Sequence, residues 1–262
     1  MTTYVLVHGA WGGSHQFGKV RRLLQSAGHE VFNPCLTGIG ERAHLTGPRV
    51  GLGTHVTDVV NTVLYEDLRD IVLLGYSYGG MVVTGTLNHI ADRVHDLVYL
   101  DAFVPDDGDS VGSLQSGRRV DPTIQLGQPW LVPPADRTYD DPADAEWLTP
   151  RRTPHPAACF AEPVRRERPV EDEAFTLTYI KALADGPVGE GAFWKAAARA
   201  QGSPRWRYRE IDTNHMVPTN RPQGLADLLL ELPEQQPGGG GGSDHHARKS
   251  PPSDRSSGAT VS

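Results

Sequence analysis

Short runs of apolar and β-branched residues recur along this chain, and each is bounded by Gly, Pro, Asn or Asp. Runs of this length and composition predict strands. Six are expected, over residues 4–7, 30–32, 71–74, 97–100, 176–180 and 206–211. Between several of them the apolar positions repeat every three or four residues, which is typical of amphipathic helices.

The clearest helical pattern lies between the second and third expected strands. Its apolar positions are Leu52, Val56, Val59, Val60, Val63 and Leu64, with Asp58 and Asn61 on the opposite face. A later helix is framed by Gly191 and Gly202, and the last begins at Pro222 and stops at Pro233. Strands that alternate with helices predict an α/β fold, with a mainly parallel sheet flanked by helices.

The alternation breaks between residues 105 and 172, where ten prolines after Pro105 are mixed with Trp130 and Trp147. So much proline disfavours regular strands, yet the aromatic side chains need burial. We therefore expect an inserted cap, over residues 105–172, that folds across the carboxyl edge of the sheet. The core is expected to span 1–104 and 173–233, and the Gly- and Ser-rich tail 234–262 is expected to be disordered.

Composition narrows the class of protein. A net charge of −7 with scattered Lys and Arg disfavours nucleic acid as a partner. Cys35 and Cys159 are too few for a disulfide framework, and no apolar run approaches the about 18 residues of a membrane span. We expect a soluble cytoplasmic protein that does not bind membranes. Whether it is a monomer or a homodimer stays open, and His245 and His246 in the tail are expected to be solvated.

The segment 71–83 combines an expected buried strand, the hexapeptide GYSYGG at 75–80 and an apolar helix start. This pattern is typical of a nucleophile elbow, in which a strand reverses into a helix and exposes a serine at the turn. Ser77 is therefore the candidate nucleophile. A second Gly-x-Ser-x-Gly match surrounds Ser110, but it lacks the strand before and the helix after, so we expect a loop there.

A serine hydroxyl needs a base that takes its proton. His215 is the candidate, because it follows the sixth expected strand and precedes the last helix, which places it at the same edge as Ser77. His8 ends the first strand and is expected to shape the following loop. His155 lies in the insertion, so neither of these two histidines has the position of a base.

Three aspartates compete for the carboxylate that would orient His215. Asp185 follows the fifth expected strand after a short link and is the preferred candidate. Asp101 ends the fourth strand and is the rival, either as the acid or as a carboxylate that caps the next turn or holds the cap. Asp212 shares the histidine's own loop and would have to curl back on it.

Two backbone N–H groups must hold the negative oxygen that develops during attack. Tyr78, directly after the nucleophile, and Ala10, in the loop HGAWGG at 8–13, occupy the expected places. That loop lacks the spacing of a nucleotide-binding loop. The candidates for an aromatic pocket lining, each of which could equally belong to the packed interior of the cap, are Trp11, Tyr76, Trp130 and Trp147.

Five segments, taken in order, resemble the α/β-hydrolase superfamily, in the branch that holds plant methylesterases, hydroxynitrile lyases and many bacterial esterases. They are YVLVHGAW at 4–11, LTGIGER at 36–42, GYSYGG at 75–80, LDAFVP at 100–105 and NHM at 214–216. The resemblance covers about residues 4–232 and implies a six-stranded parallel core, an inserted cap and no metal or organic cofactor. It also implies an acid after the penultimate strand, which supports Asp185 over Asp101, although the surroundings of Asp185 differ from the family's usual acid loop.

The lyases of this branch resemble one another at three positions, where they have threonine, cysteine and lysine. This chain has Gly9, Tyr78 and Met216 there, and an apolar methionine cannot hold a cyanide leaving group as an anion. The sequence therefore predicts a serine hydrolase that cleaves a small or medium carboxylic ester through an acyl-enzyme. The alternatives are a cofactor-free carbon–carbon lyase with the same residues, and a non-catalytic ligand-binding protein on a retained hydrolase fold.

Overall fold

The six apolar runs form one parallel sheet in the computed structural model, which describes residues 1–115 and 130–232. The strands are β1 (Thr3–Val7), β2 (Glu30–Phe32), β3 (Ile71–Tyr76), β4 (Val94–Leu100), β7 (Thr176–Ala182) and β8 (Trp206–Ile211). They lie in the order β2-β1-β3-β4-β7-β8, and each neighbouring pair is parallel. The predicted α/β fold with a six-stranded sheet is confirmed.

Four strands are longer than the sequence predicts, and one of them, β1, begins one residue earlier, at Thr3. β3 and β7 each continue further at the carboxyl end, and β4 begins earlier, at Val94. The added part of β4 contains His95 and Asp96. Because these residues are polar, the pattern of apolar residues did not predict this part of the strand. Asp96 is fully buried and pairs with His95 at 2.6 Å, and such pairing makes a buried carboxylate tolerable.

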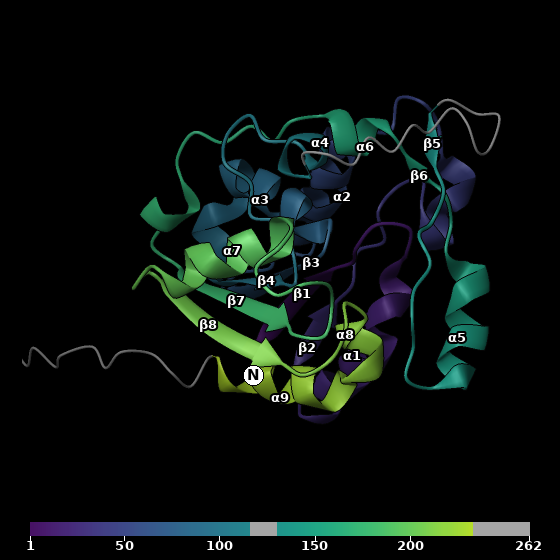
Figure 1. The fold of residues 1–262 in the computed structure, drawn as a ribbon. Coiled ribbons are helices and arrows are strands. Elements are labelled where there is room, and N and C mark those ends of the chain that lie inside the picture. The colour runs from purple at the N-terminus through teal and green to yellow at the C-terminus, as the bar shows by residue number, and fades with distance from the viewer. Residues whose placement is uncertain (116–129, 233–262) are drawn as a thin grey trace, which may run out of the picture.

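Helices cover both faces of the sheet. α2 (Leu52–Tyr65), α3 (Gly79–Ile90) and α7 (Ala192–Gln201) lie on one face, and α1 (Gly18–Ser26) and α9 (Pro222–Glu231) lie on the other (Figure 1). Successive strand residues point to opposite faces, so that Leu73 joins one apolar cluster and Leu74 the other. The expected helices are present, and the expected stop at Pro233 lies outside the described residues.

The chain between β4 and β7 loses the strand–helix alternation, as its prolines predict. Its described parts hold α4 (Val111–Leu114), α5 (Pro142–Leu148), α6 (Ala158–Ala161) and an antiparallel pair of two-residue strands, β5 (Leu131–Val132) and β6 (His155–Pro156). That pair departs from the expectation that no strand forms here. The division into core, cap and tail stays a prediction, and the tail from residue 233 lies outside the described residues.

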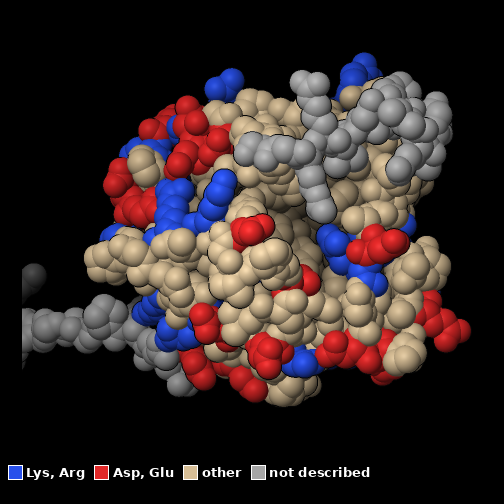
Figure 2. Space-filling view, in the orientation of Figure 1, with Lys and Arg blue, Asp and Glu red and all other residues tan. Residues whose placement is uncertain are grey.

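The charges on the surface and the length of the helices are relevant to the expectation that the protein binds neither nucleic acid nor membranes. The face shown in Figure 2 mixes Lys and Arg with Asp and Glu, and no basic stripe crosses it. Across residues 1–115 and 130–232, no helix is both long enough and apolar enough to span a membrane. The absence of nucleic-acid and membrane partners stays a prediction, and so does the compartment.

Candidate active site

Ser77 occupies the turn between β3 and α3. Its φ is +58°, a left-handed backbone conformation that residues other than glycine rarely adopt. Glycines on both sides make the turn sterically possible. A Cβ on Gly75 would come within 2.6 Å of the Val83 side chain, and one on Gly79 within 2.6 Å of the carbonyl oxygen of Val7. The strand, sharp turn and helix expected around Ser77 are therefore all present.

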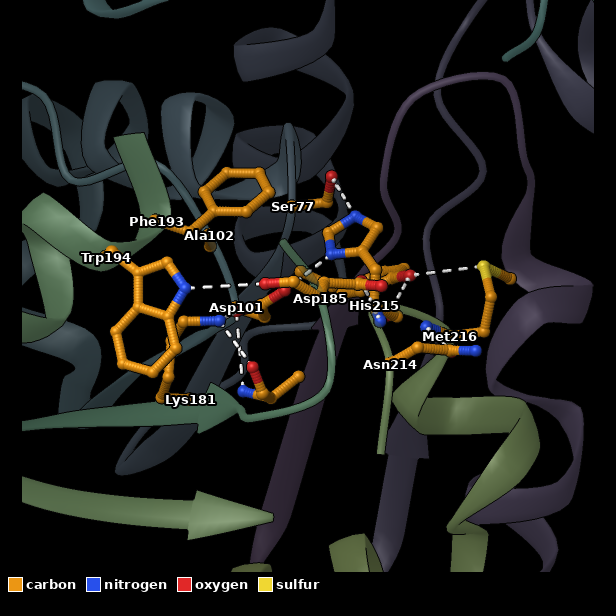
Figure 3. Close-up of polar contacts among 12 residues, drawn as sticks. Ser77, Asp101, Ala102, Lys181, Asp185, Phe193, Trp194, Asn214, His215 and Met216 are labelled. Carbon is orange, nitrogen blue, oxygen red and sulfur yellow. Dashed lines mark hydrogen bonds and ion pairs between the residues drawn. The ribbon is translucent and has the colours of Figure 1, made fainter. Parts of the chain in front are cut away.

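His215 lies directly opposite this serine, in the loop between β8 and α8 (Val217–Asn220) (Figure 3). Its Nε2 is 2.8 Å from Oγ of Ser77. The imidazole ring packs against two aromatic rings: it stacks on Phe193, whose ring centre lies at 5.1 Å, and contacts Tyr76 at a tilt, with the ring centre at 5.0 Å. The Tyr76 hydroxyl also donates to the backbone carbonyl of His215 at 2.6 Å. The base candidate is thus held by two aromatic rings and at its backbone.

Asp101 is the carboxylate that faces the imidazole. Its Oδ2 lies 2.7 Å from Nδ1 of His215. Because an ionised carboxylate can only accept, Nδ1 carries the proton and Nε2 is free to accept the Ser77 hydroxyl. Asp101 is fully buried at the end of β4. Burial alone would raise its pKa, but the hydrogen bond from His215 and the charges of His215 and Lys181 outweigh burial and lower that pKa.

The sequence favours Asp185 for this place, and the structure contradicts that choice. The Asp185 carboxylate accepts the backbone N–H of His215 rather than the ring N–H. Its loop lies alongside the histidine loop, because the N–H of Ala184 donates to the Thr213 carbonyl at 2.9 Å. The Asp185 carboxylate therefore bonds to the backbone N–H of His215, which is the nearer donor. Asp101, at the end of the neighbouring strand, bonds to the ring N–H instead. Asp212, the third candidate, is exposed.

The loop after β1 packs against the nucleophile. A Cβ on Gly9 would lie 3.0 Å from Cβ of Ser77, so the two turns touch. Among the described residues, no backbone hydrogen bond is made by the N–H of Ala10 or of Tyr78 outside the helices and strands. His8 shapes this loop, as expected: its Nδ1 donates to the Gly9 carbonyl at 2.9 Å, and its Nε2 accepts the Leu36 N–H at 3.1 Å.

Comparison with known proteins identifies the family of this chain. The profile of the alpha/beta hydrolase family matches residues 4–228. The chain belongs to the alpha/beta hydrolase family. It is 34% identical over 249 residues to the carbendazim hydrolyzing esterase of Nocardioides sp. (strain SG-4G), which covers 88% of this chain and 100% of that protein.

Two further comparisons agree with the superfamily resemblance. An alpha-hydroxynitrile lyase of Arabidopsis thaliana is 31% identical over 109 residues, which cover 39% of this chain and 40% of that protein. The solved structure of an extracellular alpha/beta-hydrolase from a Paenibacillus species superposes with a TM-score of 0.73 at 23% identity. The superposition covers 88% of this chain and 98% of the Paenibacillus protein, and it supports the fold.

The aromatic residues expected in the pocket of this hydrolase have different surroundings. Tyr76 is buried beneath His215 and packs edge-on against Phe17, so it belongs to the core. Trp147 is 46% exposed and carries the Arg151 guanidinium over its ring at 4.5 Å. Tyr76 thus packs in the core and Trp147 lies at the surface, and the pocket lining stays a prediction. The Trp11 indole donates to the Val132 carbonyl at 3.0 Å, and the Trp130 carbonyl accepts the Ala157 N–H at 2.7 Å.

A second group of buried side chains surrounds Tyr78 in this hydrolase. The Tyr78 hydroxyl donates to Nδ1 of His55 at 2.9 Å, while Nε2 of His55 donates to the Thr37 carbonyl at 2.8 Å. Nδ1 of His155 accepts the Trp11 N–H at 3.3 Å, and its Nε2 has no partner within the described residues. Burial lowers the pKa of His55 to about 4 and that of His155 well below its usual range, so both rings are neutral.

This group contains three metal-ligand types close together. Single ligand atoms of His55, His155 and Cys159 lie within 4.8 Å of one another. Both ring nitrogens of His55 are already hydrogen-bonded, and burial raises the pKa of the Cys159 thiol to about 12, so the thiol is protonated. A bound ion would have to displace these bonds. We therefore assign no metal here, and the expectation of a cofactor-free protein stays a prediction.

Two residues at the site escaped the sequence analysis. Lys181, in β7, places its ammonium 2.7 Å from Oδ1 of Asp101. A lysine next to Ile180, at the end of a strand that has no other charged residue, was a usable signal, because a buried ammonium needs an anionic partner. Phe193, which stacks on His215, starts α7 together with Ala192 and gives no such signal.

The second Gly-x-Ser-x-Gly match of the hydrolase does not form an elbow. Ser110 lies before the four-residue helix α4, where its hydroxyl accepts the Ser113 N–H at 3.1 Å as a helix cap. The expected loop is thus partly a short helix. No histidine contacts this serine among the described residues, so Ser110 is a suitable control for Ser77.

Proposed function

We propose that this α/β hydrolase cleaves carboxylic esters, with Ser77 as the nucleophile, His215 as the base and Asp101 as the orienting carboxylate. One observation carries the proposal. A continuous chain of hydrogen bonds runs from Oγ of Ser77 through both ring nitrogens of His215 to Asp101, at 2.8 and 2.7 Å. The esterase relative, which is similar over its whole length, supports the reaction class.

The first half of the proposed reaction forms an acyl-enzyme. Oγ of Ser77 attacks the ester carbonyl carbon while its proton moves to Nε2 of His215, and Asp101 stabilises the resulting imidazolium. The N–H groups of Ala10 and Tyr78 hold the negative oxygen of the tetrahedral intermediate. The intermediate collapses as the carbon–oxygen bond to the alcohol breaks. His215 gives its proton to the departing alkoxide, and the acyl group stays on Ser77.

The second half returns the enzyme to its starting state. Water attacks the acyl carbon and gives a proton to Nε2 of His215, which then protonates Oγ of Ser77 as the carboxylic acid leaves. Asp185 contributes indirectly, because its bond to the His215 backbone N–H fixes the loop that carries the base. No cofactor is needed at any step, since serine, histidine and water supply every proton and electron pair.

Hydrolysis of p-nitrophenyl acetate, butyrate and octanoate tests the proposal and reports the preferred acyl length. Wild-type protein and Ser110→Ala are expected to release p-nitrophenolate at similar rates, whereas Ser77→Ala is expected to match the buffer blank. Ser110→Ala is the matched control, because it removes a serine from the same motif elsewhere. Full activity of Ser77→Ala would overturn the proposal.

The carbon–carbon lyase alternative is less well supported by the residue after the base. Met216 is buried, and its sulfur lies 3.7 Å from the Tyr76 hydroxyl, so the residue after the base supplies no cation to hold a cyanide ion. A slowly hydrolysed ester, quenched in acid, distinguishes the reactions. Mass spectrometry should find the acyl mass on the peptide that contains Ser77. A lyase, or a non-catalytic binding protein, would leave that peptide unmodified.

A further inference from the structure

Lys181 is a buried cation that no step of the proposed reaction uses. Its side chain is 1% exposed, as is that of Asp101. The ammonium donates to Oδ1 of Asp101 at 2.7 Å, while Oδ2 of the same carboxylate faces His215 at 2.7 Å (Figure 3). One carboxylate therefore divides its two oxygens between a permanent cation and the catalytic base.

The sheet brings the two charged residues together. β4 and β7 pair in parallel register up to Leu100 and Ile180, so that Asp101 and Lys181 are the next residues on neighbouring strands. The Asp101 N–H donates to the Ile180 carbonyl at 2.8 Å, which continues the ladder to this point. The ammonium also lies 4.5 Å from the ring centre of Trp194, which covers it from the side of α7. The position of the lysine is thus built from two strands and a helix.

The lysine changes the charge that the base meets. Without it, an imidazolium at His215 would face the full negative charge of Asp101. With it, the carboxylate and the ammonium form a nearly neutral pair in a buried setting, where charges interact strongly. The lysine therefore keeps Asp101 ionised and at the same time disfavours a permanently protonated His215, which could not act as a base.

The other ionisable groups around this pair do not change charge in the working pH range. Burial is the main cause that raises the pKa of Tyr76, Tyr179 and Tyr208, so all three phenols stay neutral. Asp185 faces the backbone of His215 and is present in every variant considered below. A Lys181 variant without the charge therefore acts on this pair through the lost ammonium, which also gives up its hydrogen bond to the Ala182 carbonyl.

We propose that Lys181 is a positioning residue of the active site, which fixes Asp101 and tunes the protonation of His215 through it. This inference rests on the proposed function. Lys181→Met removes the charge and keeps an unbranched side chain. The acidic limb of the kcat/KM profile should then move to higher pH by about one unit, because the imidazolium becomes more favourable, and kcat should fall about tenfold.

The test compares three variants. Lys181→Arg keeps the charge and should leave the acidic limb within about 0.3 pH unit of wild type. Lys195→Met removes an exposed lysine of α7 and should change neither the limb nor kcat. If Lys181→Met is too unstable to purify, Lys181→Gln offers Asp101 a neutral donor, and the same alkaline shift is expected. A purely structural lysine would lower kcat at every pH without moving the limb, and that result would overturn the proposal.

An NMR titration separates this inference from the proposed function. The His215 imidazole signals are followed against pH in Ser77→Ala, with and without Lys181→Met, so that no turnover is needed. The titration midpoint should rise by about one pH unit when the lysine charge is lost. An unchanged midpoint refutes the role of Lys181 even if the protein is an esterase. A raised midpoint upholds that role even if no ester is cleaved.

Discussion

The four buried histidines of the described residues divide into two sets, His215 in one and the other three in the second, and the sets differ in their hydrogen-bond partners. His215 faces a carboxylate through one ring nitrogen and a serine hydroxyl through the other. His8, His55 and His155 are also buried, but their hydrogen bonds go to backbone groups, to one tyrosine hydroxyl and to the Cys159 thiol. Burial alone lowers a histidine's pKa and makes it a neutral bridge. A buried histidine becomes a base when an anion stabilises its charged form.

The two sets also hold different parts of the chain together. His215 connects the ends of β3, β4 and β8 at the carboxyl edge of the sheet. The neutral set connects the loop after β1 to α2 and to the insertion, because His155 accepts the Trp11 N–H and contacts the ring of Phe160. In the proposed reaction His215 provides the chemistry, whereas the neutral set links the insertion to the loop after β1.

Removal of one histidine from each set should separate these roles most strongly. His215→Ala is expected to lower kcat by about a million-fold, as loss of one member of a cooperating triad does, with little change in stability. His55→Ala should instead lower the free energy of unfolding by about 2–4 kcal/mol, because it opens a cavity and leaves two bonded groups unpaired. Ester hydrolysis and urea unfolding, measured on both variants, check the contrast. Equal loss of turnover in both would contradict it.

The two aspartates near His215 provide the next comparison. Asp101→Asn should lower kcat about 10,000-fold, since an amide N–H opposite Nδ1 forces the wrong tautomer of the ring. Asp185→Asn keeps an oxygen that can accept the backbone N–H of His215, so the expected loss is about tenfold or less. Steady-state kinetics on p-nitrophenyl butyrate distinguish them. A larger loss for Asp185→Asn would restore the choice that the sequence favours.

The neutral set predicts that the protein loses stability in mild acid. Burial lowers the pKa of His8 and His55 to about 4, and that of His155 well below 6.5, while in the unfolded chain all three titrate near 6.5. The unfolded state therefore takes up more protons as the pH falls from 6.5 towards 4. In this pH range each histidine should lower the free energy of unfolding by about 1.4 kcal/mol per pH unit, and the three together by about 4 kcal/mol per pH unit.

Urea unfolding at pH 8.0, 6.5 and 5.5 measures this loss. Between pH 8.0 and 6.5 the free energy of unfolding should change little from these groups, and most of the fall should come below 6.5. His155→Gln should reduce the slope by about a third, whereas His89→Gln, at an exposed position, should leave it unchanged. A stability that is flat down to pH 5 would show that these rings are not neutral in the folded protein. Asp101 does not interfere, because its lowered pKa lies below this window.

The smallest effect is expected at the tyrosine beneath the base. Tyr76→Phe removes the hydroxyl that donates to the His215 carbonyl but keeps the ring that packs against the imidazole. A single buried hydrogen bond contributes about 1 kcal/mol, which corresponds to about a fivefold fall in kcat if the loop shifts. Single-turnover kinetics with p-nitrophenyl acetate measure it. A loss of several hundredfold would indicate that the hydroxyl touches the substrate.

The sequence predicts much of the fold and of the candidate site, because both depend largely on local patterns of residues. Apolar runs mark the six strands, and the spacing of glycines around Ser77 marks its turn. Chain order places Ser77 and His215 at one edge, where the structure brings them within hydrogen-bond distance. The partner of the imidazole could not be derived in the same way, since it depends on which strand ends lie side by side.

The choice between Asp101 and Asp185 illustrates that limit. Both follow strands that end at the correct edge, and both approach His215, one at its ring and one at its backbone. The register of β4 against β7 places Asp101 beside Lys181. That register cannot be predicted from the sequence of either strand alone. The lysine at the end of β7, a strand with no other charged residue, was a local hint that the end of β4 carries a buried negative charge.

The most direct test of the whole account is covalent labelling of Ser77 with a fluorophosphonate probe. Such probes react with a serine whose proton is taken by a neighbouring base. Mass spectrometry of the wild-type protein should find the label on the peptide that contains Ser77 and not on that of Ser110. Folded His215→Ala and Asp101→Asn should label at least a hundredfold more slowly. Unlabelled wild type, or labelling that ignores both substitutions, would contradict the account.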